Sequence, residues 1–126
     1  MSTTPFPEVR LYEPGRDVTA EATAAVTLKK FVKIAGDRAT GGNSAVTVAA
    51  AGDRAFGVAG ENAGIGELVR VVRGGIVKVI AGADITAAAE VQVGAGGTVI
   101  TKAAGIAVGY AITGATSGHD AQIVLH

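Results

Sequence analysis

The chain has 126 residues, a length that suits one domain with a core of its own. It contains no Cys, which excludes a disulfide framework, a thiol nucleophile and a cysteine-ligated metal site. Its 11 basic and 11 acidic residues give a formal net charge of zero. Proteins that bind nucleic acid normally carry a basic excess that neutralises phosphates, so we expect no nucleic-acid partner.

The aliphatic residues indicate the fold class. Val and Ile together number 26, against only 4 Leu. β-branched side chains prefer the pleated, half-buried surface of a strand, whereas helical proteins are usually rich in Leu. The composition therefore predicts an all-β protein, built as a small β-barrel or sandwich of short strands.

Residues 1–16 differ from the rest of the chain because they hold all three prolines, together with Phe6, Arg10, Tyr12 and Arg16. Proline removes a backbone donor and fixes φ, so this segment is unsuited to a central strand. We expect an extended N-terminal arm over residues 1–16, followed by a single β domain over residues 17–126. A frayed terminus is the alternative.

Short apolar runs alternate with glycine-rich turns after the arm, at a spacing of roughly ten residues that is typical of a sandwich or barrel. The predicted strand runs are 18–19, 26–34, 45–48, 56–59, 67–73, 76–80, 91–93, 98–101, 106–113 and 121–125. One short helix is predicted over residues 84–89, with Asp84 as its N-terminal cap.

Residues 70–80 combine two apolar runs with the pair Gly74-Gly75 between them. This pattern fits a hairpin with a two-residue primed turn, or one long strand kinked at a glycine bulge. In either case alternation places four valines toward the core and three basic residues toward solvent. The valines are Val69, Val71, Val77 and Val79, and the basic residues are Arg70, Arg73 and Lys78.

An internal repeat joins two parts of the chain. Gly57-Val58-Ala59 and Gly109-Tyr110-Ala111 are 52 residues apart, and each is followed nine residues after its first glycine by another glycine and an apolar run. Repeats of this kind predict two related β halves, which we expect to pack about a pseudo-twofold axis. Chance similarity in so simple an alphabet is the alternative.

Catalytic and metal-binding patterns are missing from the sequence. Ser117-Gly118-His119-Asp120 brings together a nucleophile, a base and an acid, but four consecutive turn residues cannot easily adopt the geometry of a triad. A solvated turn is the better interpretation. We therefore expect no catalytic, cofactor-binding or metal site, no cofactor, and no enzyme activity.

Membrane insertion is not expected either. The longest stretch without a charged residue, 103–119, contains four glycines and is shorter than the roughly 20 apolar residues of a spanning helix. The N-terminus lacks a basic region followed by an apolar one, so we expect no signal peptide and synthesis in the cytoplasm.

The order of these motifs resembles that of the capsid cement, or head decoration, proteins of tailed bacteriophages. The residues that carry the resemblance are Phe56-Gly57-Val58-Ala59, Gly66 to Val71, Gly75-Ile76-Val77, Gly97-Thr98-Val99, Gly109-Tyr110-Ala111 and the closing run 121–125. The resemblance covers roughly residues 26–125. It implies a protein on the outer capsid surface of the virion, made in the host cytoplasm, bound to the major capsid protein and grouped as a homotrimer at threefold positions.

This resemblance supplies no catalytic residues but gives the arm a role. We expect Phe6 and Tyr12 to fill apolar pockets on the shell while Arg10 and Arg16 meet carboxylates. Two alternatives belong to other classes of protein. One is a small trimeric β-barrel enzyme with sites at subunit boundaries, and the other is a self-associating structural module unrelated to phage.

Overall fold

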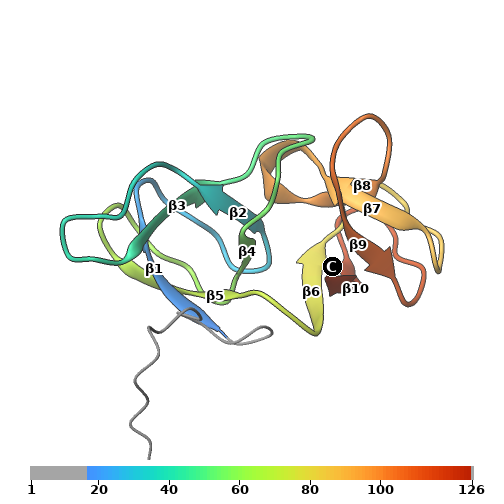
Figure 1. Cartoon of the computed structure of the whole chain (residues 1–126). Helices are drawn as coiled ribbons and strands as arrows, with labels where there is room; N and C mark the ends of the chain where they lie inside the picture. The colour runs from blue at the N-terminus through green and yellow to red at the C-terminus, as the bar shows by residue number, and fades with distance from the viewer. Residues whose placement is uncertain (1–16, 126) are drawn as a thin grey trace, which may run out of the picture.

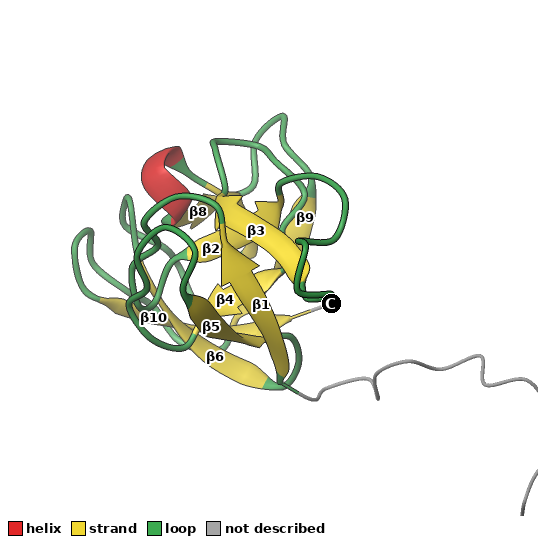
Figure 2. Cartoon of the chain, turned by 90° about the vertical axis from the view of Figure 1, so that its left-hand side faces the viewer, coloured by secondary structure: helices red, strands yellow, loops and turns green. Residues whose placement is uncertain are grey.

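The computed structural model describes residues 17–125, whose regular secondary structure is almost entirely β (Figure 1). This confirms the all-β prediction, and each of the ten predicted runs overlaps one strand. The strands are β1 (Val18–Ala22), β2 (Phe31–Ile34), β3 (Ser44–Val48), β4 (Gly57–Ala59), β5 (Leu68–Val72), β6 (Ile76–Ile80), β7 (Glu90–Val93), β8 (Val99–Thr101), β9 (Ala107–Ala111) and β10 (Asp120–Leu125). Figure 2 shows a single helical turn in this part of the chain, the 3-10 turn η1 (Ala95–Gly97) between β7 and β8.

The first five strands form a closed barrel in the order β1-β3-β2-β4-β5. The barrel closes because β1 pairs with β5 in antiparallel and with β3 in parallel. Alternating side chains point into this barrel and make an apolar cluster of their own. Its buried members are Ala20, Ala22, Val26, Val32, Val46, Ala59, Ala63, Val69 and Val71.

The last five strands form a second sheet in the order β6-β10-β9-β7-β8. If β6 to β10 are taken as the counterparts of β1 to β5, each strand has the same neighbours in this sheet as its counterpart has in the barrel. The difference is at the closure, where a single parallel bridge between Ala81 and Val99 replaces the three residue pairs that join β1 to β3. The second sheet is therefore a barrel left open between β6 and β8.

Strand registers confirm the predicted repeat. Val18 pairs with Val71 in the first half, and Val77 pairs with Ile123 in the second. Likewise Val32 pairs with Gly57, and Val91 pairs with Gly109. Equivalent residues are thus 59 positions apart in the first two strands of each half and 52 apart in the last two. Most of this difference arises because the β2–β3 connection is longer than its counterpart between β7 and β8.

Gly57 and Gly109 occupy equivalent places where adjacent strands approach too closely for a side chain. A Cβ atom on Gly109 would lie 1.9 Å from the carbonyl oxygen of Val124, and one on Gly57 would lie 2.6 Å from that of Val72. Only glycine fits at such a crossing. The repeated glycines therefore preserve the same strand contact in both halves.

The two halves meet through the start of β2. The Ile80 N–H donates to the Lys29 carbonyl at 3.0 Å, and the Lys29 ammonium pairs with Asp120 at 2.9 Å. A Cβ atom on Gly97 would lie 2.8 Å from the carbonyl oxygen of Phe31, so the chain at Lys29–Phe31 lies beside both β6 and the β7–β8 turn. The Phe31 side chain is fully buried in a cluster made mostly of second-half residues. Phe31 thus closes the opening that the second sheet leaves.

This packing is not that of a twofold axis, so the expected pseudo-twofold was wrong. A twofold would bury equivalent residues in both halves. Phe31 and Val58 are buried at the junction, but their equivalents Glu90 and Tyr110 are exposed. The physical reason is that the first barrel is closed by its own hydrogen bonds and has no gap to accept a partner, whereas the second sheet has one.

The strands on either side of Gly74-Gly75 do not pair with each other, which overturns the hairpin. They are not one kinked strand either, because residues 73–75 are not in a strand and β5 and β6 belong to different sheets. β5 pairs with β1 and β4, and β6 pairs with β10, so this glycine pair joins the two halves. The predicted faces are confirmed: the four valines are buried and the three basic residues are exposed. Alternation identified the faces of these strands but not their partners.

The helix predicted over residues 84–89 does not form. Ile85 instead makes a β-bridge with Ala115, and Ala88 adopts a positive φ of 68°. The Asp84 carboxylate accepts a hydrogen bond from the Ser117 N–H, 33 residues away, rather than capping a helix. Contacts between distant segments outweighed the local preference of alanine for a helix.

Candidate functional site

The arm residues predicted to bind a partner, Phe6, Arg10, Tyr12 and Arg16, lie outside the described residues. The β domain itself presents surface hollows, several polar turns and a set of exposed apolar side chains.

A groove of about 200 Å³ runs between the two halves. Its apolar lining includes Phe56, Val108 and Leu125. The Arg73 guanidinium lies 4.5 Å from the centre of the Phe56 ring, and its Nε–H donates to the Phe56 carbonyl at 2.8 Å. The lining residues include no carboxylate, imidazole or hydroxyl side chain, so this groove is equipped for contact rather than for acid–base or nucleophilic chemistry.

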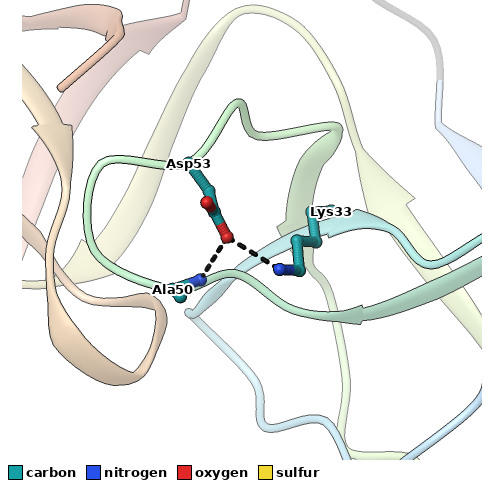
Figure 3. A network of polar contacts seen from close by, with 3 residues as sticks. All are labelled: Lys33, Ala50 and Asp53. Carbon is teal, nitrogen blue, oxygen red and sulfur yellow. Dashed lines mark hydrogen bonds and ion pairs between the residues drawn. The ribbon is translucent and has the colours of Figure 1, made fainter.

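Asp53 organises the turn between β3 and β4 (Figure 3). One of its carboxylate oxygens accepts the Lys33 ammonium at 2.8 Å and the Ala50 N–H at 2.9 Å. The hydrogen bond from Lys33, followed by that from Ala50, holds the pKa of Asp53 below its usual range. These two interactions hold the turn in place, and the Lys33 ammonium balances the charge of the Asp53 carboxylate.

The segment Ser117 to Asp120 is a turn leading into β10, as predicted. The Asp120 carboxylate is held by Lys29 of the other half, and this hydrogen bond lowers the pKa of Asp120. The Ser117 N–H donates to Asp84. The backbone of this turn and the Asp120 carboxylate therefore serve contacts between segments.

Two further findings concern residues 17–125. No three His, Cys, Asp or Glu side chains gather there in a way that could hold a metal ion. The same range contains no helix with the length and apolar character needed to cross a membrane.

Exposed apolar side chains are the strongest surface feature of the described domain. Eight large ones are between 42% and 77% exposed. They are Leu28, Ile34, Ile65, Leu68, Ile76, Ile106, Tyr110 and Ile112. The sequence analysis did not identify these residues as exposed. The internal repeat could have identified one of them, because Tyr110 is the equivalent of Val58, which the first half buries. Exposed apolar side chains mark a contact surface where they gather, and Leu28 and Ile76 line one surface hollow together.

The comparisons with known proteins indicate a structural protein. A model of the phage cement protein family matches residues 12–126. No curated protein matches the chain. Among solved structures, the N base of head fiber gp8.5 of bacteriophage phi29 has a similar fold, with a TM-score of 0.74 and 23% sequence identity over 88% of this chain and 93% of that one. The chain belongs to the phage cement protein family, which assigns it a structural role associated with the phage capsid.

Proposed function

We propose that this protein is a capsid decoration, or cement, protein that binds the outer surface of a phage head and stabilises the shell. The match of the family model to residues 12–126 carries this proposal. It is supported by a rigid double β architecture with exposed apolar side chains on both halves. In this role the protein acts through its surface and is not an enzyme, and it needs no cofactor.

The physical requirements of decoration fit the fold. A capsid lattice presents many adjoining sites, so modest affinity at each contact becomes strong binding when neighbouring copies hold one another in place. A protein made in many copies must also avoid edge-to-edge aggregation. The closed first barrel has no free edge, and the bridge between Ala81 and Val99 shortens the opening of the second sheet.

The partner in this proposal is the major capsid protein, and the bound form is a homotrimer at threefold positions of the virion surface. Nucleic acid and membrane lipid are not partners. The arm adds contacts on the shell, with Phe6 and Tyr12 in apolar pockets and Arg10 and Arg16 beside carboxylates. A proline-rich segment loses little entropy on docking because its backbone is already restricted.

Co-sedimentation of the purified protein with mature, undecorated capsids of its own phage tests the proposal. We expect saturable binding at a whole-number ratio to the major capsid protein, and a higher melting temperature of the decorated shell. A folded protein that does not sediment with capsids would refute decoration. Binding without any change in shell melting would refute the stabilising role.

Deletion of residues 1–16 tests the arm separately. We expect the truncated protein to retain the circular dichroism spectrum of the full chain and to bind capsids more weakly. The matched control keeps the arm and replaces only Arg10 and Arg16 with Gln, which removes charge without removing Phe6 or Tyr12. Unchanged binding by the truncated protein would remove the arm from the proposal.

A further inference from the structure

The contact between the two halves uses one face of the first barrel. Lys29, Phe31, Val58 and Val72 form this face: Phe31 and Val58 are buried at the junction, Val72 packs against the same cluster, and Lys29 binds Asp120. Strand registers identify the equivalent residues of the second half. They are Ala88, Glu90, Tyr110 and Val124, and we call them the distal face.

Most of the distal face is exposed in the described domain, and Val124 is half-buried. Tyr110 is 44% exposed, Ile112 beside it is 43% exposed, and Ala88 and Glu90 are exposed as well. The surface that docks a neighbouring barrel in one half of the molecule is therefore presented to solvent in the other.

The second half meets the first through Ile80, Val93 and Asp120. Ile80 donates to Lys29, the Val93 carbonyl accepts the Gly52 N–H at 2.9 Å, and Asp120 pairs with Lys29. The equivalent residues of the first half are Glu21, Ile34 and Leu68, which we call the proximal face. Ile34 is 49% exposed and Leu68 is 52% exposed, although Val93, the equivalent of Ile34, is fully buried.

The two exposed faces are chemically matched at the position of the ion pair. Where the junction within the chain joins Lys29 to Asp120, the distal face carries Ala88 and the proximal face carries Leu68. Both members of the pair are apolar there, so no charge is left without a partner at that position if the two faces meet. Elsewhere each face carries one carboxylate, Glu90 on the distal face and Glu21 on the proximal face. The distal face has Glu90 at the position of Phe31, and the closed first barrel has no opening to receive a ring.

We propose that the distal face of one copy docks on the proximal face of a second copy, so that contact between copies repeats the contact between the halves of one chain. The occupant of each face is another copy of this protein. Because the two faces differ, the association is head-to-tail and closes into a ring when the rotation between successive halves permits. This inference rests on the self-association in the proposed function and is independent of capsid binding.

Cross-linking between single-cysteine variants tests which faces meet, in a chain that has no cysteine of its own. Ala88→Cys and Leu68→Cys are prepared separately, then treated with a short bismaleimide alone and as a mixture, both in concentrated solution and on capsids. We expect covalent dimers from the mixture and none from either variant alone. Dimers from a single variant would show that like faces meet, and no dimer under any condition would show that these faces do not meet. Either result overturns the proposal.

Charge substitution gives a second measurement. Leu68→Glu should weaken self-association at least about tenfold, as judged by sedimentation equilibrium, because central apolar anchors dominate such interfaces. Ile65→Glu is the matched control, since Ile65 is 77% exposed and lies on neither face. Equal association of both variants would overturn the proposal. Capsid binding without head-to-tail cross-links would refute this inference and leave the decoration proposal standing. Cross-links without capsid binding would refute decoration and leave this inference standing.

Discussion

Replacement of Phe31 with Ala tests how the two halves are held together. The ring is fully buried and belongs to the first half by sequence, yet it packs among the interior residues of the second. A buried Phe→Ala substitution costs about 3–5 kcal/mol, and the upper part of that range applies where neighbours cannot collapse into the space. The surrounding strands are fixed by their ladders, so we expect a loss of about 4 kcal/mol in the free energy of unfolding.

Phe56→Ala is the matched control. Its ring lines the groove, is partly exposed and stacks on Arg73, so we expect a loss of about 1 kcal/mol. A total stability of about 5–15 kcal/mol is usual for a domain, so the first substitution removes a large share of it and the second does not. Phe31→Leu should fall between the two because it retains part of the buried apolar volume.

Denaturant unfolding followed by two probes measures these changes. Far-ultraviolet circular dichroism reports all strands, and Tyr110 fluorescence reports the second half once the other tyrosine is removed by Tyr12→Phe. We propose that residues 17–126 form a single domain, so both probes should give one transition in the parent chain. In Phe31→Ala the Tyr110 transition should move to lower denaturant. A loss for Phe31→Ala no greater than that for Phe56→Ala would refute the proposed role of the ring.

Two further substitutions test the strand crossing and the ion pair. Gly109→Ala should destabilise the protein by about 1–3 kcal/mol in the same assay, because the added methyl group meets the Val124 carbonyl, whereas Gly36→Ala, with nothing within 4 Å, should change stability by less than about 0.5 kcal/mol. Asp120→Asn should be less stable than the parent at neutral pH, since the folded-state pKa of Asp120 is lowered and its ionised form is favoured. That difference should shrink as the pH falls through the folded-state pKa, and a constant difference down to acid pH would contradict the assigned pair.

Local chemistry was enough to predict much of the fold. Alternation of β-branched residues with glycine turns located all ten strands of residues 17–125, and the spacing of Gly57 and Gly109 revealed the duplication. These features are readable because side-chain periodicity and glycine conformation act within a few residues of the chain. The buried faces of β5 and β6 followed from the same rule.

Strand partners and the packing of the halves were decided by contacts between distant segments. Gly74-Gly75 looks locally like a hairpin turn, but β5 pairs with β1 and β4, and β6 pairs with β10. Residues 84–89 likewise form no helix, because Ile85 makes a β-bridge with the distant Ala115. The opening of the second sheet is filled by the Phe31 ring, which β2 of the first half contributes. The equivalent residue of the second half, Glu90, fills no such opening and is exposed. A single sequence marks those two positions as equivalent only after the registers are known, because burial is a property of the assembled core and not of the local pattern.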